Sequence, residues 1–371
     1  MIKKVLMIGN SVRNIACSAK KAGYIVYALD LFGDVDMQKC ANKTQLLGNK
    51  SMNELQDLVE SFGDVDAIIL GSGFETLTLN LKNTLNNTPK IAEEAADKLK
   101  LPEKLDSLGI PHPMTEPIDK ADGLDFPLMI KPRAGSGGMR NVVVRNEAEM
   151  NNFRDKFDSH DFIAQEFIEG VPCSASLIST GDDAVVVALN EQLIGIPWLT
   201  RVPFAYCGNI TPFHAKFNEK MIQYAKQIAI EFKLGGSNGV DFMMNDKGIQ
   251  VLEINPRFQG SLDTVELSTG LNIFDAHVRS FEGKLPQLRE SGCFAAKTII
   301  FAEKELVITK EVSDILIKCM SYGKAADIPQ PGLTIHPDEP VTTLLATART
   351  RMTVFDKVRK TCELIKRRTE V

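Results

Sequence analysis

The sequence predicts a mixed fold, in which an α/β unit is followed by an α+β unit and a small β-rich end. Strand-like and helix-like segments alternate over residues 4–70, which is the order of βαβ units with a parallel sheet. After residue 109 the alternation is lost, and after 290 the chain is again strand-like. We therefore expect three domains, at residues 1–92, 93–285 and 286–371.

Bulk composition favours a folded protein that acts on small molecules. The chain has 371 residues, of which 44% are apolar and 25% charged. A net charge of −5 gives no general attraction to nucleic acid or to anionic membranes, and no segment approaches the roughly 18 apolar residues of a membrane span. We expect no signal peptide, a cytoplasmic location, and small-molecule partners, with a homodimer as one assembly that the chain could form.

The cysteine and histidine patterns do not indicate a disulfide framework or a zinc site. Seven cysteines are scattered without a CxxC pair, and five histidines lack ligand spacing. We therefore expect reduced thiols that mostly serve as small buried hydrophobes.

Three loops of the first domain are expected to meet at one sheet edge. Strands are predicted at 4–8, 24–29 and 67–70, with helices at 16–22 and 51–62, the second opened by a capping box. The loops that follow these strands contain Arg13, Asp30 and Glu75. Arg13 is a candidate for binding a substrate carboxylate and Glu75 for binding an ammonium, although both could simply serve turns and caps.

The remaining elements follow from periodicity and punctuation. Helices are expected within 91–108 and at 147–158, 218–232 and 349–368, and strands at 128–131, 141–145 and 184–189. Segment 206–212, which contains Asn209, is expected to be a loop that lines an acceptor pocket, with Trp198 nearby. The cations of the last helix are better explained by a solvated face than by a nucleic-acid site.

A hairpin near residue 250 could gather metal ligands. Glu253 and Asn255 are two apart on a predicted strand, so their side chains share one face. Asp241 joins them if the turn spans about five residues, from 245 to 249, because a slip of one residue would move it to the other face. Oxygen ligands of this kind favour Mg²⁺ or Mn²⁺ over zinc. The alternative is an ordinary amphipathic hairpin with solvated charges.

A glycine-rich turn lies between two predicted strands upstream. It runs from Arg133 to Arg140, and its glycines expose backbone NH groups that can bind phosphate oxygens, with Lys131 nearby. The loop residues expected at a phosphate are Ser136, Gly137 and Gly138. Alone, this turn is no more specific than an ordinary glycine hairpin.

These segments resemble the ATP-grasp superfamily. The run DFMMNDKGIQVLEINPRFQGS, residues 241–261, is similar to its metal-binding signature, and the glycine turn is similar to its phosphate loop. The resemblance implies an ATP-grasp fold with a Rossmann-like pre-ATP-grasp domain in front, and ATP with Mg²⁺ or Mn²⁺ as cofactors. It also implies that Lys98 and Lys131 contact ATP, and that Asp241, Glu253 and Asn255 are the metal ligands.

The resemblance extends to the adenine site. Segment 163–170 is similar to the family's interdomain segment, where the Glu166 carbonyl and the Ile168 NH would bind the adenine edge. The implied adenine-site residues are Gln165, Glu166, Phe167 and Ile168. A plain buried strand is the alternative. Pro172 and Cys173 stand where relatives carry a ribose contact, so that contact is left open.

The loop after the hairpin resembles the carboxylate–amine ligase branch of the family. Arg257 matches an arginine that stabilises the transferred phosphoryl group or the intermediate, against the alternative of a salt-bridged structural arginine. Segments 270–275 and beyond 290 resemble biotin carboxylases. However, Gly260-Ser261 replaces the glutamate those enzymes use on bicarbonate, and Ser261 becomes a candidate substrate contact. The loop resembles those of carboxylate–amine ligases, including the pyrrolysine-pathway lysine ligase.

The resemblance implies a ligase that phosphorylates a carboxylate with ATP and lets an amine displace phosphate. Its expected partners are a small carboxylate and a small amine. One alternative keeps the fold but uses bicarbonate or simple phosphoryl transfer. Two others are an oxidoreductase, which the missing GxGxxG spacing disfavours, and a nucleotide-binding regulatory protein without turnover.

Overall fold

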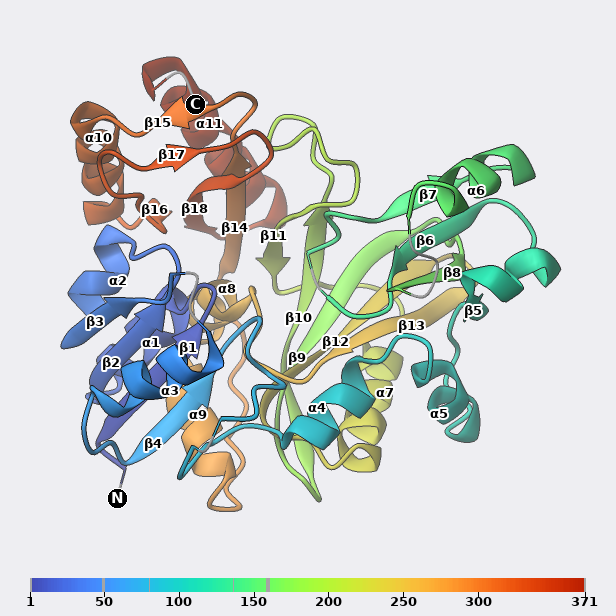
Figure 1. Cartoon of the computed structure of the whole chain (residues 1–371), viewed down its shortest axis with the longest axis horizontal. Coiled ribbons are helices and arrows are strands. Elements are labelled where there is room, and N and C mark those ends of the chain that lie inside the picture. The colour runs from blue at the N-terminus through green and yellow to red at the C-terminus, as the bar shows by residue number, and fades with distance from the viewer. Residues whose placement is uncertain (1, 49–50, 80, 136, 158–160, 370–371) are drawn as a thin grey trace.

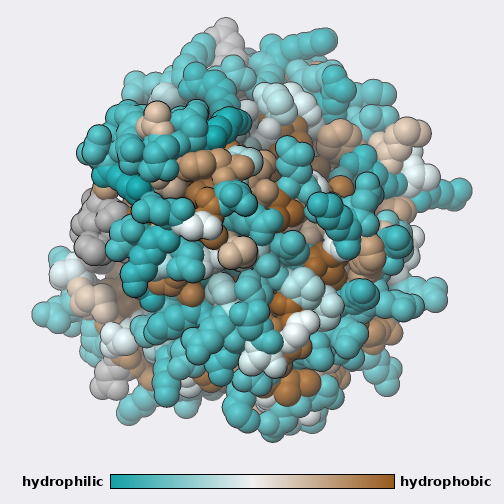
Figure 2. Space-filling view, turned by 90° about the vertical axis from the view of Figure 1, so that its right-hand side faces the viewer, coloured by the Kyte–Doolittle hydropathy of each residue, from teal (hydrophilic) through white to brown (hydrophobic). Residues whose placement is uncertain are grey.

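The computed structural model describes residues 2–48, 51–79, 81–135, 137–157 and 161–369. A parallel sheet from the N-terminal part and helices from the C-terminal part lie at one end, and a small antiparallel sheet lies at the other (Figure 1). A large antiparallel sheet runs between them. Seen from the side of the small sheet, the surface is mainly hydrophilic, with hydrophobic side chains visible in places between the polar ones (Figure 2).

The N-terminal sheet has four parallel strands in the order β3-β2-β1-β4. In β1, Val5 and Met7 enter a core on one face with helix α1, whereas Leu6 and Ile8 enter another with helix α3, as the alternation of a strand requires. The elements are β1 (Lys4–Gly9), α1 (Arg13–Lys21), β2 (Ile25–Asp30), α2 (Val35–Cys40), β3 (Lys43–Leu46), α3 (Met52–Glu60) and β4 (Ala67–Leu70).

The small sheet carries the glycine-rich turn between β6 and β7. Its strand order is β5-β8-β6-β7, and all its pairs are antiparallel. The elements of this part are α4 (Pro89–Ala96), α5 (Leu101–Ser107), β5 (Thr115–Pro117), η1 (Ile118–Gly123), β6 (Leu128–Pro132), β7 (Val142–Val144), α6 (Glu147–Arg154) and β8 (Phe162–Glu166). The end of the helix predicted at 147–158, and His160, lie outside the described residues.

The large sheet has eight strands in the order β13-β12-β9-β10-β11-β14-β18-β16. Helix α7 packs on one part of it and α11 on another, and α9 packs against both this sheet and α1. The sheet strands are β9 (Val171–Thr180), β10 (Ala184–Ile194), β11 (Tyr206–Thr211), β12 (Gly235–Asn245), β13 (Gly248–Asn255), β14 (Phe294–Phe301), β16 (Ala325–Ala326) and β18 (Pro340–Ala348).

The remaining elements are helices and one short strand pair. They are α7 (Asn218–Glu231), α8 (Leu262–Thr269), α9 (Ile273–Ser280), β15 (Leu306–Val307), α10 (Lys310–Ser321), β17 (Thr334–Ile335) and α11 (Arg351–Thr369). In the part of the chain that the structure describes, no helix combines the length and the apolar character that crossing a membrane requires.

One expected domain boundary falls inside a helix and the other in a connection between two elements. The boundary at 92/93 lies inside α4, and that at 285/286 lies in the connection between α9 and β14. Because β14, β18 and β16 continue the sheet of β9–β13, the second and third expected domains share one sheet. The division into three domains stays a prediction.

Several local expectations were wrong. Segment 206–212 is mostly strand β11 inside the large sheet and not a loop, because Cys207 and Ile210 are buried in a core with β14. Helix α10 lies where strands were expected. The sequence also gave no signal for α2 and β3, which are short and, in the case of β3, have no fully buried residue.

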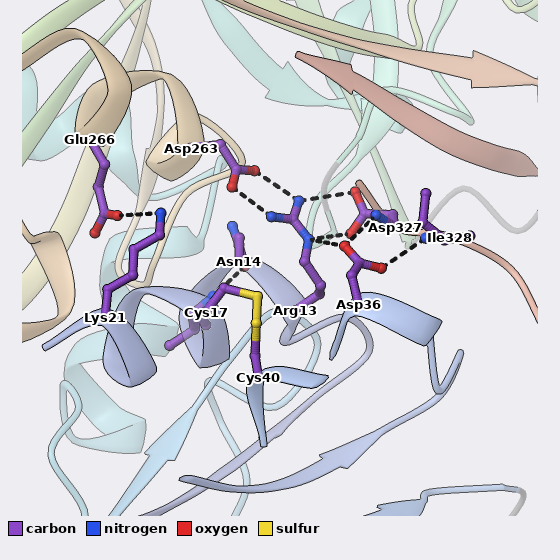
Figure 3. Close-up of a disulfide and its surroundings, with 11 residues drawn as sticks. Arg13, Asn14, Cys17, Lys21, Asp36, Cys40, Asp263, Glu266, Asp327 and Ile328 are labelled. Atoms are coloured by element: carbon purple, nitrogen blue, oxygen red, sulfur yellow. Dashed lines mark hydrogen bonds and ion pairs between the residues drawn. A yellow bond between two sulfur atoms is a disulfide. The ribbon is translucent and has the colours of Figure 1, made fainter. Parts of the chain in front are cut away.

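The expectation of only reduced thiols was also wrong. Cys17 on α1 and Cys40 at the end of α2 form a disulfide, with their Cα atoms 4.9 Å apart (Figure 3). The two are separated by 23 positions without any motif, so the pairing follows from how α2 packs against α1. The other five cysteines are free, and Cys173, Cys207 and Cys362 are buried as expected.

Candidate functional site

A β-bulge sets the register of the hairpin. Asn245 pairs with Gly248 across a two-residue turn, which is shorter than the five residues expected. Asp241 nevertheless lies opposite Glu253, because the register shifts by one residue at Leu252. An extra residue in one strand of a pair moves every later side chain to the other face. The bulge thus gives the register that a longer turn was expected to give.

The three candidate metal ligands lie together. Asn255 Nδ2 donates to Asp241 Oδ2 at 3.0 Å, and Gln192 Nε2 donates to Asp241 Oδ1 at 3.1 Å. Burial and the neighbouring Glu253 raise the pKa of Asp241 to about 8. Burial opposes ionisation of Glu253, but Lys98 and Lys131 outweigh it and lower its pKa.

This donor set fits a divalent cation. Two half-buried carboxylates face each other, and without a cation desolvation and their repulsion favour the protonated form of Asp241. All the available donors are oxygen, as Mg²⁺ prefers. Asn255 turns its NH₂ to Asp241 and its oxygen to Arg257, so rotation of the amide by half a turn would present the oxygen to a cation.

Two buried lysines stand beside the carboxylates. Lys98 Nζ lies 3.2 Å from Glu253 Oε2 and donates to the carbonyl of Gly135 at 2.9 Å. Lys131, on β6, is 6% exposed, and burial lowers its pKa to about 8 against the opposing effect of Glu253. The buried ammonium groups of Lys98 and Lys131 can supply the positive charge that a polyphosphate needs.

The glycine turn lies against the segment before β11. Gly137 and Gly138 have φ of +82° and +70°, which is the left-handed region that favours glycine. The Gly137 carbonyl accepts from the Tyr206 NH at 3.1 Å, and a Cβ on Gly138 would lie 1.9 Å from the Phe204 carbonyl oxygen. Ser136, expected at a phosphate, lies outside the described residues.

The expected adenine segment forms β8 and the turn after it. The Gln165 side chain donates to Thr115 Oγ1 at 2.8 Å, and the Phe167 NH donates to the Pro127 carbonyl at 3.3 Å. Within the described part of the chain, the Ile168 NH has no protein acceptor. That leaves this donor available to a ligand.

Arg257 and Glu75, which were expected to have separate tasks, are ion-paired through Arg257 Nε. The Arg257 guanidinium also donates to the carbonyl of Phe258 at 3.0 Å and to Asn255 Oδ1 at 3.2 Å. Glu75, which was expected to bind a substrate ammonium, is therefore paired with a guanidinium of the protein instead. The pair joins the loop after β4 to the end of the hairpin.

The substrate role expected of Arg13 does not fit its surroundings. Its guanidinium makes two hydrogen bonds to Asp263, at 2.6 and 2.8 Å, and two to Asp327, at 2.7 and 3.1 Å (Figure 3). Asp36 lies 3.6 Å away. With its three nitrogens bound to carboxylates, Arg13 holds α1, α8 and the segment after β16 together.

The last two expected contacts differ from each other. Asn209 is buried in a hydrogen-bond network with Tyr206, Thr211 and Thr264. Ser261 lines the cavity described below, and its hydroxyl lies 3.0 Å from that of Ser176. Ser261 therefore remains a candidate substrate contact. Asn209 instead accepts a hydrogen bond from the side chain of Tyr206, a residue that lines the cavity.

One cavity of about 830 Å³ connects these groups, a size typical of ligand sites. Of the residues expected in the site, it is lined by Arg13, Lys98, Lys131, Gly137, Gly138, Gln165, Glu166, Phe167, Ile168, Asp241, Glu253, Asn255, Arg257 and Ser261. The N-terminal domain and the C-terminal part also contribute walls, through Phe32, Asp34, Lys297 and Asp327 among others.

Two cavity residues were missed although the sequence carried a signal. Gln192 stands two positions after Asn190 in a strand that is apolar over 184–189, so both face the same side of β10. Lys297 is the single charge in the apolar strand β14. Charged or amide side chains within buried strands are costly unless they serve a site or a partner.

The sequence and fold match known proteins. Residues 95–261 match the family model of the ATP-grasp domain. An uncharacterised Methanocaldococcus jannaschii protein, MJ0776, is 27% identical over 99% of this chain and 94% of its own length. The carbamoyl phosphate synthase large chain of Clostridium perfringens is 24% identical over 66% of this chain, but the match spans only 24% of that protein.

Solved structures extend the similarity over nearly the whole chain. Biotin carboxylase of Campylobacter jejuni has a TM-score of 0.75 at 16% identity, covering 96% of this chain and 90% of that one. N5-carboxyaminoimidazole synthetase of Staphylococcus aureus with ADP has a TM-score of 0.73 at 17% identity, covering 98% of this chain and 98% of that one. L-amino acid ligase of Bacillus licheniformis has a TM-score of 0.70 at 16% identity, covering 96% of this chain and 96% of that one. Residues 95–261 therefore match the ATP-grasp domain, and the chain as a whole has the fold of these solved structures.

Proposed function

We propose that this protein is an ATP- and Mg²⁺-dependent ligase that joins a carboxylate to an amine. ATP converts the carboxylate into an acyl phosphate with release of ADP, and the amine then displaces phosphate to form an amide. Carboxylates resist amines because their leaving group is poor, and the acyl phosphate removes that obstacle. Holding both substrates in place can contribute about 7–11 kcal/mol without a protein nucleophile.

The observation that supports this proposal most is the convergence on one cavity. The hairpin carboxylates, the two lysines and the glycine turn come from three separate parts of the chain and line the same 830 Å³ space. Solved relatives of this fold include complexes with ADP and with an ATP analogue, and one is an L-amino acid ligase.

Each group has a proposed task. Asp241, Glu253 and Asn255 would hold Mg²⁺, which when bound would neutralise and orient phosphate oxygens. Lys98 and Lys131 spread the remaining phosphate charge, and Gly137 and Gly138 let the backbone approach the phosphates. The list of proposed adenine contacts is Gln165, Glu166, Phe167 and Ile168.

Arg257 lies at the end of the hairpin, where a negatively charged intermediate would form. Its pairing with Glu75 fixes the guanidinium while part of it still lines the cavity. The glycine turn already rests on the segment before β11, and closure of this kind excludes water from an acyl phosphate. A cytoplasmic location and a homodimer remain parts of the proposal.

Trapping of the intermediate with hydroxylamine tests the proposal. The protein is incubated with ATP, Mg²⁺, hydroxylamine and a carboxylate library, and hydroxamates and ADP are measured. We expect a hydroxamate with at least one carboxylate, and a loss of about 10²-fold or more for Asp241→Asn, the order seen when transition-state charge stabilisation is removed. The exposed-residue variant Asp57→Asn is the matched control.

A lack of hydroxamate from every carboxylate, together with unchanged ATP turnover in Asp241→Asn, would rule the ligase out. Bicarbonate-dependent ADP release without any amine would instead favour the carboxylase alternative. ATP binding without product would favour a regulatory protein. The three outcomes differ in what is released, so one assay separates them.

A further inference from the structure

The carboxylate of Asp34 is buried and, within the described part of the chain, has no hydrogen-bond or ion-pair partner. Asp34 precedes helix α2 and is 6% exposed, and its side chain lines the cavity. An aspartate at this position commonly accepts a hydrogen bond from a helix NH, but this one does not. Among the described residues it makes no side-chain hydrogen bond or ion pair. Its oxygens are therefore left for something in the cavity.

Its neighbours leave an excess of negative charge. Asp30, Asp36 and Asp327 all act on Asp34 as like charges, and Arg13 is the cation that opposes them. Arg13 already binds Asp263 and Asp327 with all three nitrogens. Lys297, which lines the cavity, is likewise directed to Asp263 at 3.3 Å.

Burial is the main cause that raises the pKa of Asp34 to about 9, and the negative charges of Asp327 and Asp30 add to it. A buried carboxyl group in this state gains most from a cation placed next to it. The nearby carboxylates of Asp30 and Asp36 already accept from backbone NH groups, and that of Asp327 accepts from Arg13. Among these described residues, Asp34 alone is left to bind a cation, which suits a single ammonium group better than a metal ion that needs several oxygen ligands.

The cavity that Asp34 lines also has apolar walls. Phe32, Pro329, Leu333 and Ile335 line the same cavity, and Phe32 and Leu333 are among the large hydrophobic side chains that remain partly exposed. A compound with an aliphatic body and a charged amino group would satisfy both kinds of surface.

We propose that Asp34, with Asp327 beside it, binds the ammonium group of a substrate with an aliphatic body. That ammonium is a binding group and stays unreacted, so one of the two joined compounds carries an amino group beyond the bond that forms. The inference rests on the proposed function for the reaction, but the binding site itself can be tested without turnover.

Binding is measured by thermal shift and calorimetry in the presence of Mg·ADP. The probes are a library of primary amines that includes L-valine and 1,4-diaminobutane, each beside the form in which every amino group is acetylated. We expect free amines to bind, N-acetylated forms to bind at least about 30-fold more weakly, and Asp34→Asn to weaken the free amines by a similar factor, since a buried charge pair is lost. Asp57→Asn, an exposed change on α3, should leave binding unchanged.

A second readout separates binding from a purely structural role. Without ligand, Asp34→Asn should melt at the same or a higher temperature than wild type, because it removes an uncompensated buried carboxylate. A structural aspartate would give a lower melting temperature. In buffers of different ionisation enthalpy, binding at pH 8 should release protons in wild type and not in Asp34→Asn.

The outcomes distinguish this inference from the proposed function. If no free amine binds, or if N-acetylated forms or Asp34→Asn bind equally well, the ammonium site is wrong even where hydroxamates form. If amines bind through Asp34 while no carboxylate yields a hydroxamate, the site stands and the ligase does not.

Discussion

The guanidinium of Arg257 is ion-paired with Glu75, so the hairpin that carries the candidate metal ligands is tied to the loop after β4. Arg257 also donates to Asn255, and the pair therefore lies one hydrogen bond from the proposed metal site. Both side chains are mostly buried, with 12% and 20% exposure. A pair at this depth matters more than a surface ion pair, because water screens it less.

Two single variants at this pair separate its two roles. We expect Arg257→Ala to lower kcat by about 10²-fold or more, because the charge next to the intermediate is lost. Glu75→Gln keeps that charge, so it should lower stability by about 1–2 kcal/mol and kcat by less than Arg257→Ala. Equal losses of kcat in both single variants would mean that Arg257 acts only through the ion pair.

The hairpin carboxylates predict opposite effects on the free and the ligand-bound protein. Asp241→Asn removes one of two repelling, half-buried carboxylates, so we expect the melting temperature without metal to stay equal or rise. The stabilisation by Mg·ADP should largely disappear, since a ligand stabilises only as far as it binds the folded state. Melting curves with ADP, with Mg·ADP and with neither measure this. A Mg·ADP shift as large as in wild type would exclude Asp241 as a ligand.

Spacing along the chain was enough to predict that two proposed metal ligands share a face. It did not reveal the bulge in the hairpin or the distant partners of Arg13 and Cys17. Glu253 and Asn255 share a face by strand alternation alone, but the bulge at Leu252 that aligns Asp241 has no sequence signature. Arg13 was assigned to substrate from its place in a loop at the sheet edge, but its three carboxylate partners lie up to 314 positions away in the chain. Local pattern cannot reveal such partners, and the Cys17–Cys40 pairing was missed for the same reason.

The glycine turn predicts a difference between two neighbouring positions. Gly138→Ala should push the turn away from the Phe204 carbonyl, because the new Cβ would overlap that backbone atom. Gly137→Ala has similar backbone strain, but its Cβ would meet nothing within 4 Å. We expect Gly138→Ala to lower kcat/KM for ATP at least about 10-fold more than Gly137→Ala, with less than about 1 kcal/mol between their stabilities. Steady-state kinetics and denaturant unfolding measure both quantities, and equal kinetics would mean that contact with Phe204 is not needed.

His277 predicts a pH dependence of stability. It is buried, accepts from the Ser237 NH at 2.9 Å through Nδ1, and lies 2.9 Å from the Leu85 carbonyl through Nε2. Burial lowers its pKa from 6.5 to about 4. The unfolded chain therefore takes up a proton first, so stability is complete above pH 6.5 and is lost as the pH falls toward 4.

The loss specific to His277 amounts to about 3 kcal/mol. Denaturant unfolding of wild type and His277→Gln at several pH values measures it as the change in the difference between them. We expect wild type to be the more stable at pH 8 and the difference to shrink by that amount at pH 4. A difference that is constant with pH would show that His277 does not stay neutral in the folded protein.

The disulfide predicts how reduction affects the N-terminal domain. Cys17 and Cys40 close a loop with a separation of 23 positions, and loss of such a cross-link costs about 3 kcal/mol in the chain-entropy account. Dithiothreitol should therefore destabilise wild type and leave Cys17→Ala unaffected, because the variant already lacks the link.

Since Arg13 on the same helix binds Asp263 and Asp327, reduction should also loosen the junction between α1, α8 and the segment after β16. Hydrogen exchange of these segments before and after reduction measures that loosening. Two free thiols at Cys17 and Cys40 in the protein purified without reductant would contradict the link itself.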